Sequence, residues 1–185
     1  MADIYENDEQ LYSRFLAEHD ESALKTLLER HRDGLTLFLF GYVRNMEDAE
    51  DLMMDTFARI ITRSSWSMEG SSFKTWLFAI GRRLALMHLR KRKPETAVFT
   101  EEPADESAVP DLDLLREEQK RELYRAMEQL KPEYRQVLTL IYFEEMSHEE
   151  AARVMKKTKK QIYHLVDRGK ERLKVLLQGS GYEHG

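Results

Sequence analysis

The sequence predicts an all-α protein built from two small helical domains. Apolar residues recur at three- and four-residue spacing through most of the 185 residues, and only four prolines and eight glycines interrupt that pattern. An acidic, proline-containing segment divides the chain into two parts, each so short that a compact helical bundle is favoured over a sheet. The chain has no cysteine, which excludes disulfide scaffolds and thiolate zinc sites.

The first part, residues 1–93, begins with two amphipathic helical patterns. In the second of them, six residues occupy positions i, i+3, i+4, i+7, i+8 and i+11, and we expect them to be buried: Ala49, Leu52, Met53, Thr56, Phe57 and Ile60. The opposite face is then acidic with one exposed thioether, and consists of Glu47, Asp48, Glu50, Asp51, Met54, Asp55 and Arg59.

A third pattern follows the serine-rich stretch 64–72. Its apolar stripe is Phe73, Trp76, Leu77, Ile80, Leu84 and Met87. The pattern continues without a proline into 82–93, which holds six basic residues and no acidic one. One long helix is therefore expected to join a bulky apolar start to a basic end.

Residues 94–112 contain three of the four prolines, six acidic residues and no basic one. Such a composition cannot bury a core, and it predicts a flexible linker. The linker would separate a domain at 1–93 from a second domain at 113–178. We expect residues 179–185 to form a disordered tail.

The second domain shows a helix-turn-helix pattern. Helices are expected at 112–130 and 132–143, with Pro132 in a first turn. Ser147 with Glu150, and Thr158 with Gln161, match the capping box that opens a helix, so helices are predicted at 147–155 and 159–176. Two short helices of an ordinary bundle would look similar. The polar outward face of the second helix favours DNA binding: Lys160, Tyr163, His164, Asp167, Arg168 and Glu171.

Three segments together resemble bacterial RNA polymerase sigma factors of the extracytoplasmic-function (ECF) group within the sigma-70 family. They are DAEDLMMDTFARI (48–60), FKTWLFAIGRRLALMHLRKRK (73–93) and LKPEYRQVLTLIYFEEMSHEEAARVMKKTKKQIYHLVDRGKERLKVLL (130–177). The resemblance covers nearly the whole chain, with the segments in order and at the expected spacing. Lys156 stands where the helix-turn-helix of the family usually has glycine.

The resemblance implies an alternative sigma factor that binds core RNA polymerase and directs promoter-specific initiation in a stress or envelope response. Its partners would be the polymerase β′ clamp helices and β flap, promoter DNA, and an anti-sigma factor. The implied polymerase-binding residues are Asp48, Asp51, Leu52, Met54 and Asp55.

Two further sets of residues are implied to bind promoter DNA. At the minus-ten element the set is Trp66, Met68, Trp76, Arg82, Arg83, Arg90, Lys91 and Arg92; Trp76 also lies in the apolar stripe, which favours core packing over base stacking. At the minus-thirty-five element the set is Lys157, Thr158, Lys159, Lys160, Gln161, Tyr163, His164, Asp167 and Arg168.

Other functions find less support in the sequence. The six histidines form no i, i+4 pair, and neither a phosphate-binding GxxxxGK loop nor a nucleophile elbow occurs, so we expect no enzyme, no cofactor and no metal. No apolar run approaches the ~20 residues that span a bilayer, and the acidic N-terminus lacks an apolar export signal. We expect no membrane insertion and a cytoplasmic location. Two alternatives stay open: a dimeric one-component regulator that uses the helix-turn-helix without polymerase, and a helical adaptor with no DNA role.

Overall fold

A computed structural model describes residues 6–63, 71–92 and 118–179 of the chain. Every element within these ranges is helical, and the chain divides into two compact units, Met1–Thr100 and Glu101–Gly185. The prediction of an all-α protein with two helical domains is confirmed. The expected linker at 94–112 lies outside the described residues, so the domain bounds stay predictions.

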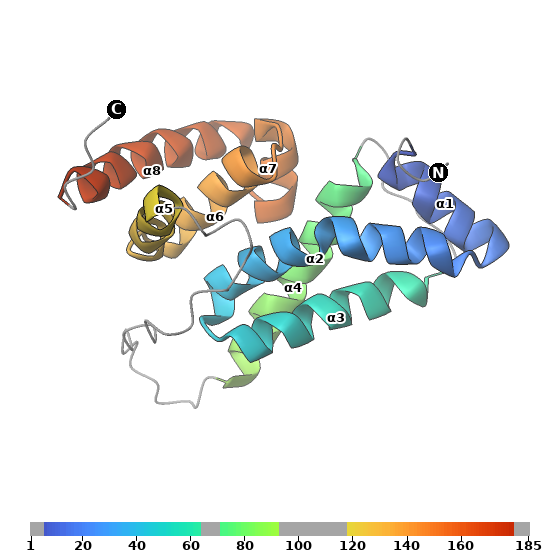
Figure 1. Ribbon diagram of the computed structural model, residues 1–185. Coiled ribbons are helices and arrows are strands. Elements are labelled where there is room, and N and C mark those ends of the chain that lie inside the picture. Colours follow the sequence, from blue (N-terminus) through green and yellow to red (C-terminus); the bar gives the residue numbers. More distant parts are fainter. Residues whose placement is uncertain (1–5, 64–70, 93–117, 180–185) are drawn as a thin grey trace. The chain divides into compact units, whose positions relative to one another are not determined.

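The first unit contains four helices: α1 (Asp8–Glu18), α2 (Glu21–Val43), α3 (Met46–Ile61) and α4 (Phe73–Arg92). α2 and α3 lie side by side, and α4 packs against both of them (Figure 1). Polar side chains fix where three of these helices begin: Asn7, Asp20 and Asn45 each accept a hydrogen bond from a backbone amide in the first turn. Such caps satisfy amides that have no partner within the helix.

The six-residue stripe predicted for 49–60 is buried, as expected. The stripe predicted after Phe73 is only partly right, because Met87 is 40% exposed whereas Phe78, Gly81 and Ala85 are buried. α4 packs against α1, α2 and α3, so more than one of its sides is covered and a single apolar stripe does not describe it.

The second unit contains α5 (Glu118–Glu128), α6 (Pro132–Leu138), the π-helical turn η4 (Thr139–Phe143), α7 (His148–Met155) and α8 (Lys159–Gly179). Both predicted capping boxes are present. The Ser147 hydroxyl accepts from the Glu150 amide at 3.1 Å, and the Thr158 hydroxyl accepts from the Gln161 amide at 3.1 Å. The helix-turn-helix prediction is thus confirmed. Gly179 ends α8 and does not begin a tail, and residues 180–185 lie outside the described residues.

The turn between α7 and α8 runs through Lys156, which has a φ of 52°. That left-handed conformation explains why glycine is usual at this place in the family, because glycine adopts it without a steric cost. α8 then packs with Ile162, Val166 and Gly169 buried against the rest of the unit, whereas Lys160, His164, Asp167 and Arg168 are exposed.

Candidate nucleic-acid and partner interfaces

The outer face of α3 combines acidic and apolar side chains. Asp51 and Asp55 are exposed, and neither forms an ion pair or hydrogen bond among the described residues. Met54 is 53% exposed, and Ile61 on the same face is 46% exposed. The sequence interpretation missed Ile61 because it ended the pattern at Ile60, although Ile61 follows Met54 by two helical turns. We call Asp51, Met54, Asp55 and Ile61 the α3 outer face.

Two other residues expected on this surface have different roles. Leu52 is only 5% exposed and belongs to the buried stripe, so its side chain offers little surface to a polymerase contact, which stays a prediction. Asp48 accepts a hydrogen bond from Arg92 and lies 3.5 Å from His88 Nε2. Asp48 therefore joins the first turn of α3 to the last turns of α4 and is not an unpaired surface acid.

The basic residues of α4 are not equally available. Arg83, Arg90 and Lys91 are exposed, and their side chains form no ion pair or hydrogen bond within the described ranges. Arg92 is paired with Asp48, and Arg82 Nε donates to the Tyr42 hydroxyl at 3.1 Å. The basic surface of α4 that the structure leaves open is thus smaller than the sequence suggests.

Trp76 is a core residue. It is 4% exposed, and its ring centroid lies 5.4 Å from that of Tyr12 and 5.9 Å from that of Phe73. Neighbouring aromatic side chains already cover the ring, which agrees with the core packing that its place in the apolar stripe favours, and a contact of Trp76 with the minus-ten element stays an untested prediction. Trp66 and Met68, the other two large side chains predicted to contact this element, lie outside the described residues.

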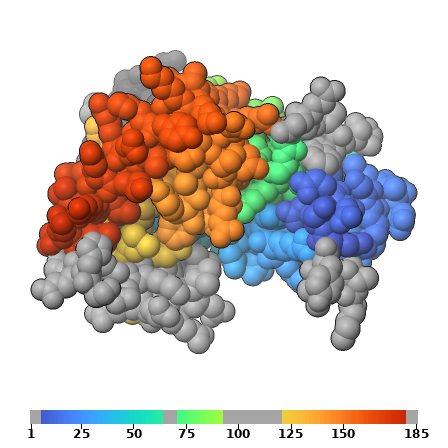
Figure 2. Space-filling view, turned by 90° about the horizontal axis from the view of Figure 1, so that it is seen from above, coloured from blue at the N-terminus to red at the C-terminus, as the bar shows by residue number. Residues whose placement is uncertain are grey.

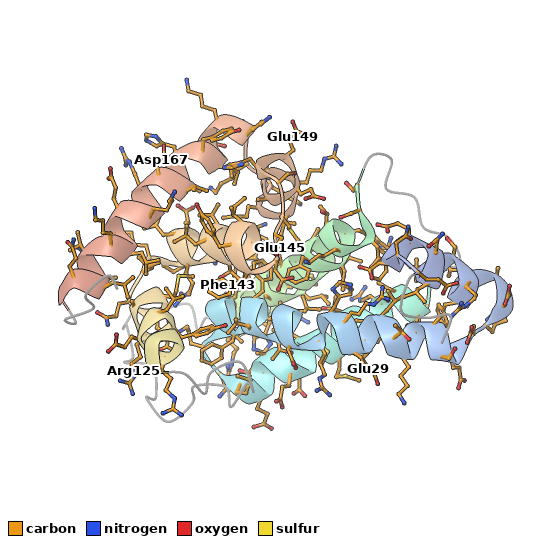
Figure 3. The ribbon with its side chains drawn as sticks, turned by 45° about the horizontal axis from the view of Figure 1, so that its top comes forward. Glu29, Arg125, Phe143, Glu145, Glu149 and Asp167 are labelled. Carbon is orange, nitrogen blue, oxygen red and sulfur yellow. The ribbon has the colours of Figure 1, made fainter. Side chains whose placement is uncertain are left out.

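The outer surface of α8 carries the side chains with which a helix-turn-helix would contact DNA. Its outer face forms part of the surface of the second unit (Figure 2), and Asp167 projects outward from it (Figure 3). Exposed side chains along this face include Lys160, His164, Asp167 and Arg168. Their chemistry suits the edges of base pairs and the phosphates beside them.

Other residues at the start of α8 bind within the unit. Lys159 Nζ lies 2.9 Å from Glu149 Oε1; the hydrogen bond and charge of this pair raise the pKa of Lys159 and lower the pKa of Glu149. Lys157 Nζ lies 3.2 Å from Glu133 Oε1. The side chains of Thr158 and Gln161 form the capping box. These residues, predicted to contact DNA, hold the start of α8 in place.

Tyr163 also has a partner inside the unit. Its ring stacks on that of His148 at a centroid distance of 4.1 Å and an interplanar angle of 14°, although Tyr163 is 48% exposed. The stack links His148, the first residue of α7, to the exposed side of α8 that carries Lys160 and His164. The Tyr163 ring is thereby held against α7.

A hollow of about 660 Å³ lies beside Arg168. Two further cationic side chains line it, Lys131 from the start of α6 and Arg172 from α8. The sequence interpretation did not select Lys131, because a single lysine before a helix carries no periodic signal. Three cations and one acid, Glu171, thus line the hollow on one flank of α8.

A groove of about 650 Å³ lies on another side of α8 and is mainly apolar. Tyr142 is 53% exposed and Phe143, labelled in Figure 3, is 37% exposed. Lys170 Nζ lies 5.7 Å from the centre of the Tyr142 ring. The apolar part of the lining is Leu123, Met127, Leu138, Tyr142, Phe143, Leu173 and Leu177.

Within the described ranges, the structure offers neither a metal site nor a membrane-spanning helix. No group of three or more His, Cys, Asp or Glu side chains could hold a metal ion. None of the described helices is both long enough and apolar enough to cross a membrane.

Comparisons with known proteins agree with this geometry. Residues 27–95 match Sigma-70 region 2, and residues 120–173 match Sigma-70, region 4. The chain is 30% identical over 164 residues to the ECF RNA polymerase sigma factor SigX of Bacillus subtilis, covering 84% of this chain and 82% of SigX. It is 28% identical over 156 residues to SigM of the same organism, covering 81% of this chain and 92% of SigM.

Solved structures show the same fold. The sigma factor RpoE of Bartonella quintana, in a complex with the anti-sigma factor NepR, matches with a TM-score of 0.62 and 26% identity, covering 83% of this chain and 96% of RpoE. CnrH, in a complex with the cytosolic domain of CnrY, matches with a TM-score of 0.64 and 22% identity, covering 93% of this chain and 97% of CnrH.

The two matched regions define the class of protein, a sigma-70-type transcription initiation factor. Within that class, the chain belongs to the ECF RNA polymerase sigma factors, and it functions as an alternative sigma factor. Sigma factors are initiation factors and not enzymes. Core RNA polymerase and promoter DNA are the partners that this membership implies.

Proposed function

We propose that this sigma factor docks on the β′ clamp helices of core RNA polymerase through the α3 outer face. The observation that carries the proposal is the composition of that face: two exposed carboxylates without a described partner lie beside two large exposed apolar side chains. Unpaired acids attract a basic surface, and apolar side chains between them supply contact area when water is excluded. Leu52 supports this face from below, and Asp48 fixes it to α4.

The two promoter elements are contacted by different units. At the minus-ten element, Arg83, Arg90 and Lys91 contact the backbone of the exposed strand. At the minus-thirty-five element, α8 enters the major groove with Lys160, His164, Asp167 and Arg168 facing the bases. The hollow beside Arg168 receives a phosphate, because the three positive charges of Lys131, Arg168 and Arg172 outnumber the one negative charge of Glu171 in its lining.

The apolar groove of the second unit is the site for the polymerase β flap. Support comes from the exposure of Tyr142 and Phe143, since aromatic side chains that remain open to solvent in a free protein are typical of partner surfaces. Lys170 at the rim adds a charge that an acidic residue of the partner can meet.

An anti-sigma factor is a further proposed partner, because RpoE and CnrH were solved in complexes, the former with the anti-sigma factor NepR. We place the protein in the cytoplasm, where polymerase and promoter DNA are found.

A charge-reversal experiment tests the docking proposal. Asp51→Lys with Asp55→Lys should abolish retention of the full-length chain by core polymerase and abolish transcription from promoter DNA. A matched control reverses two exposed acids elsewhere in the first unit, Glu18→Lys with Glu29→Lys, and should retain both activities; Glu29 projects from α2 in Figure 3.

The fold of the α3 double variant should survive, because exposed charges away from buried networks change stability by no more than about 1 kcal/mol. Circular dichroism checks this. Normal holoenzyme assembly by the α3 double variant would disprove the docking assignment. A stable homodimer that binds a palindrome without polymerase would instead support a one-component regulator.

A further inference from the structure

The turn between α7 and α8 is densely basic. Of the five residues from 156 to 160, all but Thr158 are lysines. They lie at the start of α8, and a recognition helix contacts base edges with its N-terminal residues. Positive charges at that end of the helix are placed to meet the phosphates that border the groove. The structure divides the four lysines into two that have an acidic partner and two that have none among the described residues.

Lys157 and Lys159 are each paired with a glutamate of another helix. Lys159 Nζ lies 2.9 Å from Oε1 of Glu149, which is in the first turn of α7 and is labelled in Figure 3. Lys157 Nζ lies 3.2 Å from Oε1 of Glu133, which is in the first turn of α6. A DNA phosphate would have to compete with a carboxylate for either ammonium group. These two lysines therefore gain less from DNA than their position in the sequence suggests.

Lys156 has no such partner. Its side chain is exposed and forms no ion pair or hydrogen bond among the described residues. Its backbone position is nevertheless fixed, because the amides of Lys156 and Lys157 both donate to the Ala152 carbonyl oxygen. The Thr158 amide in turn donates to Gln161 Oε1 at 2.8 Å. The Lys156 side chain thus leaves the turn at a defined place, three residues before Lys159 in the chain.

The turn itself gains nothing from a lysine at position 156. The residue has a φ of 52° and a ψ of 48°, in the left-handed region. A side chain makes that conformation costly, whereas glycine adopts it freely. A non-glycine residue held there is an observation from which a function can be inferred. What lysine adds to this position over glycine is an exposed positive charge.

We propose that Lys156 is a DNA-binding residue that contacts a phosphate beside the minus-thirty-five element, together with Lys160. Lys157 and Lys159 contribute less, because glutamates already neutralise them. This inference rests on the proposed function, in which α8 enters the major groove. A lysine at a phosphate attracts DNA of any sequence, so Lys156 adds to the affinity for DNA and not to the preference for particular bases.

The experiment measures binding of holoenzyme, formed with the full-length chain, to promoter DNA with a matched or a scrambled minus-thirty-five element across a salt series. Lys156→Gly removes the charge and gives the turn the residue that its φ favours. It should weaken binding to both DNAs alike and reduce the slope of log K against log salt by about 0.9. The advantage of the wild type over the variant should therefore shrink about threefold between about 50 mM and about 200 mM salt.

Thermal unfolding separates the loss of charge from damage to the fold. Because glycine relieves the left-handed strain, Lys156→Gly should unfold at a temperature equal to that of the wild type or a few degrees higher, although it binds DNA more weakly. Lys156→Arg keeps the charge and should keep the affinity and the salt slope of the wild type. Lys156→Asn, which tolerates the left-handed conformation without a charge, should bind DNA as Lys156→Gly does.

The ion pair between Lys159 and Glu149 provides a matched control from the same turn. Lys159→Gln combined with Glu149→Gln removes one lysine and leaves the net charge unchanged. Since that lysine is already neutralised, the double variant should bind both DNAs as the wild type does. A reduced salt slope in the double variant would show that the pair opens on DNA, and would overturn the division of the four lysines.

Unchanged affinity and salt slope in Lys156→Gly would overturn the inference, as would a loss confined to the matched DNA. A loss in Lys156→Arg as large as that in Lys156→Gly would also overturn it, because the charge would then not be what matters. Failure of the proposed function is distinct: in that case the wild-type holoenzyme itself does not distinguish the matched from the scrambled element.

Discussion

Gly81 of α4 faces α2 and α3, and replacing it with alanine tests how tightly these helices are packed. A Cβ atom at this position would lie 3.1 Å from Leu35 Cδ1, and 3.4 Å from both Leu39 Cδ2 and Thr56 Oγ1. The three neighbours are fully buried and come from two different helices. The new methyl group therefore has no open direction in which to displace them.

Two effects of opposite sign decide the outcome of Gly81→Ala. Alanine is favoured over glycine in a helix interior by about 1 kcal/mol. An extra methyl group in a filled core costs about 1 to 3 kcal/mol. Since the shortest contact is already tighter than an ordinary van der Waals distance, we expect the steric cost to exceed the gain and the free energy of unfolding to fall by about 1 kcal/mol.

Urea unfolding followed by tryptophan fluorescence measures this change in the full-length chain, because both tryptophans, Trp66 and Trp76, belong to the first unit. A double-mutant cycle with Leu35→Ala isolates the contact. Leu35→Ala alone should cost about 2 to 5 kcal/mol, and Gly81→Ala should become stabilising in its presence because Cδ1 is gone. A Gly81→Ala variant more stable than the wild type, with a coupling energy near zero, would refute the packing argument.

Further predictions concern DNA binding and pH. Arg168→Ala should cost about 1 to 3 kcal/mol of binding free energy on the preferred minus-thirty-five sequence and much less on a scrambled one. Arg172→Ala should weaken binding to both sequences alike and reduce the slope of log K against log salt by about 0.9. Holoenzyme binding to both sequences across a salt series measures both effects. Burial raises the pKa of Asp8, but the hydrogen bonds and charges of His31 and Arg30 outweigh it, so that pKa lies below its usual 3.8. The ionised carboxylate therefore stabilises the fold above pH 3.8, and that contribution is lost as the pH falls through the lowered pKa. Denaturant unfolding of Asp8→Asn should show a cost of about 1 to 3 kcal/mol at neutral pH that disappears below that pKa.

Periodicity predicted α3 well because its buried residues share one face, and local capping signals predicted the helix-turn-helix. In α3 the six apolar positions alone determine which residues are buried. In α7 and α8 the capping boxes are local, so the sequence carries both partners of each hydrogen bond three residues apart. The same method failed at Met87, since α4 is covered by three helices and its apolar residues do not follow one stripe.

The partners of charged side chains could not be predicted in this way. Asp48 and Arg92 are 44 residues apart. The sequence predicts a polymerase contact for the first and a DNA contact for the second, whereas the fold pairs them with each other. Lys159 likewise reads as a DNA contact in a basic segment, but its ion pair with Glu149 depends on the angle between α7 and α8. Composition shows that a helix is basic; only the tertiary structure shows which of its charges are already neutralised.

The pairing of Asp48 with Arg92 and His88 limits how segments of this sigma factor can be exchanged with those of another. An engineer who exchanged α3 to change polymerase affinity would also remove the carboxylate that neutralises the end of α4. The chimera would carry an additional unpaired cation on α4, and, because the proposed function places α4 against the minus-ten element, its affinity for unrelated DNA would rise together with the intended change. A segment transferred from this protein should therefore contain both α3 and α4, and a segment transferred into it should retain an aspartate at position 48.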